Sequence, residues 1–467
     1  MTSRFTKDLV IVTGGNVLYL LAQIAVGLLL PLAMSVDDFG YYKVYTLYLT
    51  YCGLLHFGFV DGMLLRFGGR EYESLDKKKF KTYLRVFMLL ELISCAAIII
   101  ISLIFLHGNM RLIIMGVSVS MILNNMILFY QYLSQATSRF KEFAILKGTN
   151  ALLILLSVLV FMSHKHFTGQ DTDFMTLIAV LIMISMVILC CYLWIYRDIT
   201  FGKSLPLSEV TTDFIDMIKA GIIMTLAYEA SRMVLLIDRQ FVSVLFDIDV
   251  YAKYAFAYNI LSCFTALIIG VSTVLFPKFK KLPQEEVIGS FADSMRNMTL
   301  LVTASLVAYF PICLIVRVLL PAYIDSIVYF QIIFPALALS ASITIMVFTF
   351  YKVLDKNLVF MKECLITLVI AFVFNILAYV IFSTPEAISV ASVFASVIWY
   401  VLSIRYLVKE HGVEWKRNFI FALSIMLCFY LSTYLIDSVI LQAVAYVLGA
   451  VILTWLFWGK SFIQKKN

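Results

Sequence analysis

The sequence predicts an all-α polytopic membrane protein of about 14 transmembrane helices, built as two six-helix lobes plus two C-terminal helices. Three observations predict it: the composition, the placement of the basic residues and an internal repeat. Of the 467 residues, 62% are apolar and 14% charged, whereas soluble domains carry about 45–50% apolar and about 25% charged residues. This composition excludes a water-soluble enzyme, and the short loops leave no room for a large soluble domain.

Apolar runs between charged clusters define the candidate spans, since a membrane helix needs about 20 apolar residues. In chain order the runs are 10–34, 41–62, 86–106, 112–134, 148–163, 174–196, 220–245, 254–276, 298–316, 327–350, 364–383, 388–404, 418–436 and 439–458. We therefore expect both termini on the same side of the membrane.

The basic residues test this count, because Lys and Arg concentrate in cytoplasmic loops. With a cytoplasmic N-terminus, 29 of the 36 Lys and Arg residues fall inside and two lie within the seventh span. The five outside residues are Lys43, Arg111, Lys165, Lys253 and Arg317. We interpret the net charge of +7 mainly as this orientation signal, and we expect no nucleic-acid partner.

A repeat with an offset of 210 residues relates the two halves. It aligns four residues of the first half with four of the second: Asp37 with Asp247, Tyr41 with Tyr251, Lys43 with Lys253, and Tyr48 with Tyr258. Because the offset equals six spans, the copies would be related by a pseudo-two-fold axis along the membrane normal. The predicted division is 1–197 for the N-terminal lobe, 198–408 for the C-terminal lobe and 409–467 for the last two helices.

The seventh span contains four charged residues, although each charge at mid-bilayer costs at least about 2.5 kcal/mol. Glu229, Arg232 and Arg239 fall within roughly an 80° arc of a helix, and Asp238 points elsewhere. One interpretation is structural, an ion pair of Glu229 with Arg232 and interfacial positions for the other two. The favoured interpretation is a water-filled cavity with spare positive charge that suits an anionic ligand.

The second span carries a stripe of aromatic and cationic residues. It comprises Tyr41, Tyr45, Tyr48, Cys52, His56 and, if the helix continues, Arg66. The eighth span has a similar set in Tyr251, Tyr254 and Tyr258. Ordinary packing explains part of these sets; the functional alternative is a lumen wall on which sugar rings stack. The eight cysteines lie in apolar stretches without metal-ligand spacing, so we expect no disulfide framework, metal site or other cofactor.

The segment from Asp37 to Phe67, the sequence VLFPKFKK from Val274 to Lys281, and the span count together resemble bacterial polysaccharide exporters. More specifically, they resemble the O-antigen repeat-unit flippases of the Wzx type, within the multidrug/oligosaccharidyl-lipid/polysaccharide (MOP) superfamily. The resemblance implies a multi-pass protein of the bacterial cytoplasmic membrane, with both termini cytoplasmic.

It also implies a transporter, not an enzyme, that flips undecaprenyl-diphosphate-linked oligosaccharide between leaflets by alternating access, coupled to a gradient of H⁺ or Na⁺. Its partners would be membrane lipid, a polysaccharide polymerase and a chain-length regulator. The resemblance places a cationic lumen at Arg232, Arg239 and Arg66. Glu229, Asp238 and His56 are the candidates for ion coupling.

Two rival functions remain. The first is a polytopic glycosyltransferase or O-antigen polymerase, in which Asp37 and Asp38 at the first external turn would serve. The sequence lacks the sizeable external loop that such an enzyme needs. The second rival is a multidrug/cation antiporter of the same superfamily. Against it, the seventh span is net basic where a cation exporter should be acidic.

Overall fold

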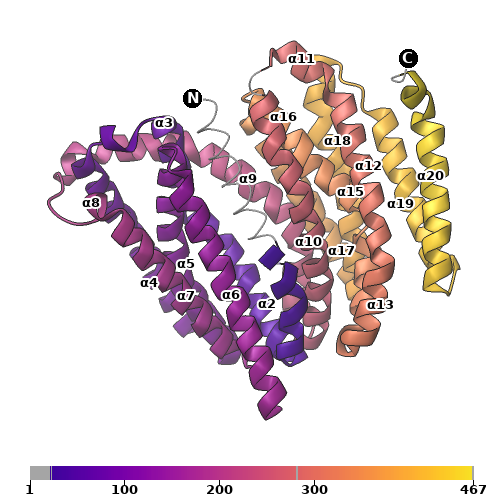
Figure 1. Cartoon of the computed structure of the whole chain (residues 1–467), viewed down its shortest axis with the longest axis horizontal. Coiled ribbons are helices and arrows are strands. Elements are labelled where there is room, and N and C mark those ends of the chain that lie inside the picture. The colour runs from indigo at the N-terminus through magenta and orange to yellow at the C-terminus, as the bar shows by residue number, and fades with distance from the viewer. Residues whose placement is uncertain (1–20, 23, 280–281, 465–467) are drawn as a thin grey trace. The chain divides into compact units, whose positions relative to one another are not determined.

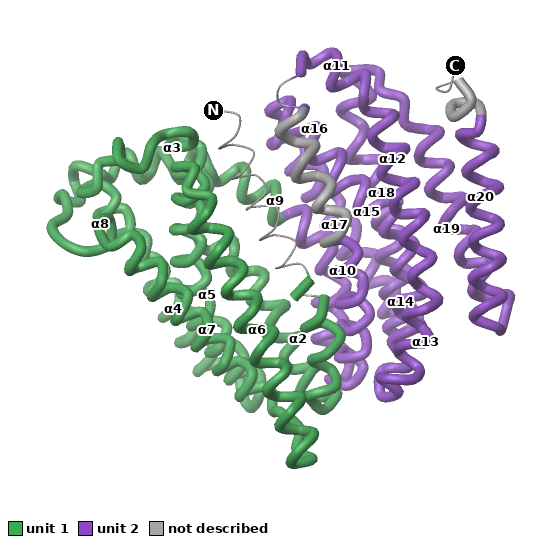
Figure 2. The backbone as a smooth tube through the Cα atoms, viewed as in Figure 1, with its two compact units in different colours: residues 1–229 green, residues 230–467 purple. Residues whose placement is uncertain are grey.

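The computed structural model describes residues 21–22, 24–279 and 282–464, and all regular structure in these residues is helical (Figure 1). Two compact units divide the chain, Met1–Glu229 and Ala230–Asn467, which Figure 2 shows in green and purple. Helix α9 (Thr211–Leu245) contributes its first part to unit 1 and its second part to unit 2. The predicted division at residues 197/198 and 408/409 stays a prediction.

Unit 1 contains, after a short apolar helix at Ile24–Ala33, the helices that correspond to predicted spans two to six. Their bounds are α2 Val36–Tyr51, η1 Cys52–His56, α3 Phe59–Phe67, η2 Tyr72–Ser74, α4 Lys77–Phe105, α5 Gly108–Ala136, α6 Phe140–Thr168, α7 Phe174–Ile195, α8 Arg197–Thr200 and η3 Leu207–Glu209. Side-chain caps begin several of them: Ser35 accepts from the Asp38 amide, and Asp173 accepts from the Thr176 amide.

Unit 2 continues from the second part of α9. Its further elements are α10 Ile248–Phe279, α11 Gln284–Gly289, α12 Phe291–Ser305, η4 Leu306–Ala308, α13 Tyr309–Leu319, η5 Pro321–Tyr323, α14 Ser326–Ile333, α15 Leu337–Ala341, η6 Ser342–Val347, α16 Phe348–Val353, α17 Asn357–Phe382, α18 Pro385–His411, α19 Lys416–Leu435 and α20 Val439–Gln464. The segment η6 is a π-helix inside an otherwise α-helical run.

The described residues hold ten helices long and apolar enough to cross a membrane, and two bent helix pairs that raise the number to 12. These correspond one by one to predicted spans two to seven and nine to 14, and α10 covers the eighth. Residues 10–20 and 23 of the first predicted span lie outside the described residues, and the helix Ile24–Ala33 belongs to its remainder. The lipid-facing chemistry agrees, because side chains such as Trp194, Val380 and Leu448 are 73%, 70% and 59% exposed on these helices.

Both units repeat one packing order, as the internal repeat predicts. In unit 1, α5 packs against α2 and α7. In unit 2, α14 packs against α10 and α18 in the same way. The last two helices, α19 and α20, pair with each other and contact α12 and α13. The prediction of an all-helical polytopic membrane protein is confirmed.

Among the described residues, one candidate span in each unit is bent at a break. The second span bends by 54° between η1 and α3, where Phe57 and Gly58 adopt left-handed φ angles of 50° and 75°. The tenth span bends by 49° between α14 and α15. The sequence predicted each as a single run, because apolar length carries no information about a local break.

Candidate functional site

In unit 2 the carboxylate of Asp238 is the centre of a buried polar cluster. Its side chain lies on α9 and is 2% exposed. The Tyr254 hydroxyl donates to Oδ2 at 2.9 Å, and the Tyr258 hydroxyl donates to the same oxygen. The Arg239 backbone N–H donates to Oδ1 at 2.7 Å. Three donors therefore hold this acid in place, which compensates for much of its burial.

Arg239 is the cation of this cluster. Its guanidinium lies over the Tyr258 ring at 4.3 Å and donates to the Leu235 carbonyl at 2.7 Å. Among the described residues its buried Nε–H has no hydrogen-bond partner. Cation–π contact leaves the donors of a guanidinium available, so the group can still bind an anion. Arg232 lies on the same helix, about 120° around its axis from Asp238, and is half-buried.

The structure thus brings together four of the predicted residues, Asp238, Arg239, Tyr254 and Tyr258. Tyr251 is buried on the same helix as the two tyrosines, with 1% exposure. The sequence predicted Asp238 and Arg239 as charges within the seventh span, on different faces, and the tyrosines as a stripe on the eighth. Their mutual contact depends on how α9 packs against α10.

In unit 1 a second polar cluster surrounds the break of the second span. The His56 Nδ1 accepts from the Gly58 amide at 3.1 Å, and its Nε2 lies 3.9 Å from Asp61 Oδ2. The Thr225 hydroxyl of α9 donates to the same Asp61 oxygen at 2.5 Å. Asp61 was missed by sequence reasoning, although an acid within an apolar run at FVDG was the available signal.

Glu229 lies beside η1. Its side chain is buried at 4% exposure, and a Cβ built on Gly53 would stand 2.8 Å from its Oε1. A side chain at residue 53 would therefore require this carboxylate to shift. Of the three predicted coupling residues, His56 ends η1 and Glu229 lies beside η1, both in unit 1, and Asp238 belongs to the cluster of unit 2.

The tyrosines of the second span do not share one environment. Tyr45 is buried and its hydroxyl donates to Ser120 of α5 at 2.7 Å. Tyr41 is half-buried and its ring lies 5.0 Å from that of Phe174. Tyr48 is half-buried, with its ring 6.3 Å from Tyr51. The sequence pattern groups them on one helix face, and the neighbouring helices α5 and α7 give them different partners.

Arg66 lies at the end of α3, where it pairs with the first turn of α9. Its Nη2 is 2.6 Å from Asp213 Oδ1. The other carboxylate oxygen is 3.1 Å from Lys79 Nζ and accepts from the Tyr83 hydroxyl at 3.0 Å. The guanidinium is therefore engaged in joining two elements, and its side chain is 38% exposed.

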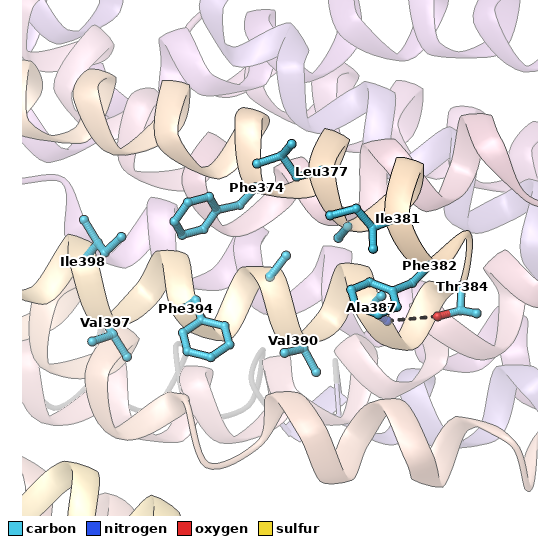
Figure 3. Close-up of a pocket in the computed structure, with 12 residues that line it drawn as sticks. Phe374, Leu377, Ile381, Phe382, Thr384, Ala387, Val390, Phe394, Val397 and Ile398 are labelled. Atoms are coloured by element: carbon cyan, nitrogen blue, oxygen red, sulfur yellow. Dashed lines mark hydrogen bonds between the residues drawn. The ribbon is translucent and has the colours of Figure 1, made fainter.

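A groove of about 730 Å³ between α17 and α18 has the opposite chemistry (Figure 3). Phe374, Leu377, Phe394 and Ile398 line it, and no charged residue does. Thr384 marks its polar end, where its hydroxyl accepts from the Ala387 amide at 3.3 Å. The groove suits an acyl chain and offers nothing to a charged headgroup.

Comparison with known proteins assigns the class of fold. No family model matches the chain, and no curated protein sequence matches it. Solved structures of MOP-superfamily transporters do match: an inward-facing multidrug resistance MATE transporter has a TM-score of 0.57 at 14% identity and covers 85% of this chain and 96% of its own. A MOP-superfamily transporter from Pyrococcus furiosus has a TM-score of 0.52 at 11% identity, with 87% and 95% coverage. The chain has the MOP transporter fold.

One match within that fold extends over nearly the whole molecule. The lipid II flippase MurJ, in an inward closed conformation, superposes with a TM-score of 0.71 at 11% identity. The match covers 98% of this chain and 100% of the flippase. At this identity the likeness concerns the fold.

Proposed function

We propose that the chain is a flippase that moves an undecaprenyl-diphosphate-linked oligosaccharide from the cytoplasmic to the periplasmic leaflet by alternating access. The observation that carries the proposal is the extent of the structural match. The lipid flippase fold covers 98% of the chain, whereas the inward-facing multidrug transporter covers 85%.

The charged residues of α9 support the same assignment. A diphosphate is an anion that guanidinium groups hold by paired, charge-assisted hydrogen bonds. Arg239 offers an unused buried N–H beside an aromatic ring, and Arg232 lies two turns earlier. We assign the diphosphate to these two residues and the sugars to the tyrosines near them. A gradient of H⁺ or Na⁺ would drive the cycle.

The finer assignment, to the O-antigen repeat-unit branch, rests on the sequence resemblance. It implies a bacterial inner-membrane location, cytoplasmic termini, and a polymerase and chain-length regulator as partners. A deletion strain tests it: lipid-linked repeat units should accumulate on the cytoplasmic leaflet, and expression of the chain should release them.

Purified protein in proteoliposomes tests the chemistry. Since a hydrogen bond to a charged group contributes about 1.5–3 kcal/mol, Arg232→Gln and Arg239→Gln should each weaken lipid-diphosphate binding by about 10- to 100-fold. Arg139→Gln is the matched control, because Arg139, just before α6, forms a partly exposed pair with Glu142 at 2.8 Å. If the double α9 variant translocates glycolipid normally while drug efflux disappears, the antiporter function replaces this proposal.

A further inference from the structure

Unit 1 contains a buried acid for which neither the predicted site nor the proposed function accounts. Glu91 lies in the apolar middle of α4 and has 0% exposure. The Asn125 side-chain amide of α5 lies 3.0 Å from each of its two carboxylate oxygens. A carboxyl in a membrane helix is costly, so its presence calls for a function.

The surroundings of Glu91 supply no positive charge. Within the described part of the chain, no Lys, Arg or His forms an ion pair with it. Elements in contact with α4 include α5, η1 and α8, as well as α3 through Phe59 and α9 through Asp213. From α5 it meets the neutral Asn125, from η1 the Cys52 thiol, and on its own helix the Cys95 thiol. Asp198 of α8 pairs with Lys77, and Asp213 of α9 pairs with Lys79 and Arg66. An ionised carboxylate here stands uncompensated.

An amide is the partner that serves both protonation states of an acid. Its NH₂ donates to an ionised carboxylate, and after a half-turn its carbonyl accepts from the protonated acid. A lysine or arginine could stabilise only the ionised form, and an apolar neighbour only the neutral form. The Glu91–Asn125 pair is therefore suited to a group that gains and loses a proton.

The same amide reaches the break of the second span. Asn125 Nδ2 lies 3.4 Å from the backbone carbonyl of Cys52, the first residue of η1. Five residues later the chain enters the left-handed turn at Phe57 and Gly58. A half-turn of the amide removes this contact, so the protonation state of Glu91 is linked to hydrogen bonding at the start of η1.

We propose that Glu91 is a proton-binding site of unit 1, and that Asn125 transmits its protonation state to the break of the second span. A proton from water forms the O–H bond on one carboxyl oxygen and returns to water later in the cycle. The proposal rests on the proposed function in taking H⁺ as the driving ion. It names a site separate from His56, Glu229 and Asp238.

Infrared spectroscopy of the purified full-length protein tests proton binding without any substrate. The wild type should show a carboxylic-acid carbonyl band that Glu91→Gln abolishes. Gln is the matched replacement, because it keeps the shape and the contact with Asn125 but has no proton to lose. Glu142→Gln, at the half-exposed pair with Arg139, should leave the band intact. A band unchanged in Glu91→Gln overturns the proposal.

A second variant protects the test against misfolding. If Glu91→Gln does not accumulate in the membrane, Asn125→Ala decides, because loss of the amide should shift the Glu91 band and leave the bands of other carboxyls in place. An identical spectrum in Asn125→Ala contradicts the assignment.

Translocation in proteoliposomes then tests the coupling. In the wild type an imposed pH gradient should accelerate flipping, and Glu91→Gln should reduce that acceleration at least tenfold while basal flipping persists. Full acceleration in a folded Glu91→Gln protein overturns the coupling role. If the wild type flips no lipid-linked glycan, the proposed function fails, and the infrared band still decides whether Glu91 binds a proton.

Discussion

The two broken spans differ in chemistry, although they belong to units built on one packing order. The break in unit 1 joins η1 to α3 through two left-handed residues, and His56, Asp61 and Glu229 lie around it. The break in unit 2 lies near Pro335, in an apolar run that also contains serine and threonine residues. Hydroxyls among them bond to backbone carbonyls one turn earlier, as that of Ser342 does to Ala338. The segment 326–347 itself carries no Asp, Glu, Lys, Arg or His.

In unit 2 the buried charge lies instead on long helices. Asp238 and Arg239 belong to α9, and the tyrosines that hold Asp238 belong to α10. Repetition of the fold has therefore not repeated the chemistry. Titratable groups at a bend can change its geometry, whereas an acid held by three donors between continuous helices is suited to binding with little movement.

The largest effect should follow from a methyl group at the unit 1 break. A Cβ on Gly62 would lie 1.8 Å from the Met217 carbonyl oxygen of α9, so backbone must move. Gly62→Ala should cost about 4 kcal/mol or more in the free energy of unfolding. Thermal unfolding in detergent measures it. Gly289→Ala, which meets nothing within 4 Å, is the control, and equal melting of Gly62→Ala and wild type would disprove the close contact.

The second-largest loss of stability should follow from the replacement of Asp238 in unit 2. Asp238→Leu leaves the hydroxyls of Tyr254 and Tyr258 without their acceptor, at about 1–3 kcal/mol each. Asp61→Leu in unit 1 should cost less, because Thr225 also donates to the Gly221 carbonyl at 3.2 Å. Denaturant unfolding of both variants compares the two clusters. A larger loss for Asp61→Leu would reverse the distinction between a firmly held acid and one at a bend.

Arg66 should have a smaller effect than its predicted role in a cationic lumen implies. Because its pair with Asp213 is 38% and 22% exposed, Arg66→Ala should lower stability by no more than about 1 kcal/mol. It should leave glycolipid translocation within about twofold of wild type, as expected for a residue that joins α3 to α9. A loss of translocation comparable to that of Arg239→Gln would instead mean that Arg66 belongs to the substrate site.

The smallest effect is a change in how stability depends on pH, and it concerns unit 1 alone. Burial opposes ionisation of Asp198, but the Tyr72 hydroxyl at 2.6 Å and Lys77 at 3.5 Å outweigh it and lower the pKa of this carboxyl. Stability from Asp198 is thus complete above the ordinary carboxyl pKa and is lost as pH falls through the lower, folded value. Asp198→Asn should flatten the acid side of the melting-temperature profile. An unchanged profile would mean that this pair adds no stability.

Much of the fold was predictable because membrane spans are a one-dimensional property. Length and apolarity along the chain identify helices such as α7 and α17 whatever they pack against, and the basic loops predict an orientation. The same criteria tolerate one acid in an apolar run, which is why Asp61 and Glu91 did not stand out. They also do not reveal the left-handed residue Phe57.

By itself, the sequence determined the spans, the repeat and the charged face of α9, since each depends on spacing within a segment. Only the tertiary structure decided which of those residues meet. Glu91 faces Asn125 34 positions away, and Arg66 pairs with Asp213 147 positions away. Glu229 of α9 lies beside Gly53 of η1, 176 positions away. The physical reason is that burial and hydrogen-bond partners set the chemistry of a charged group, and both come from helices distant in the chain.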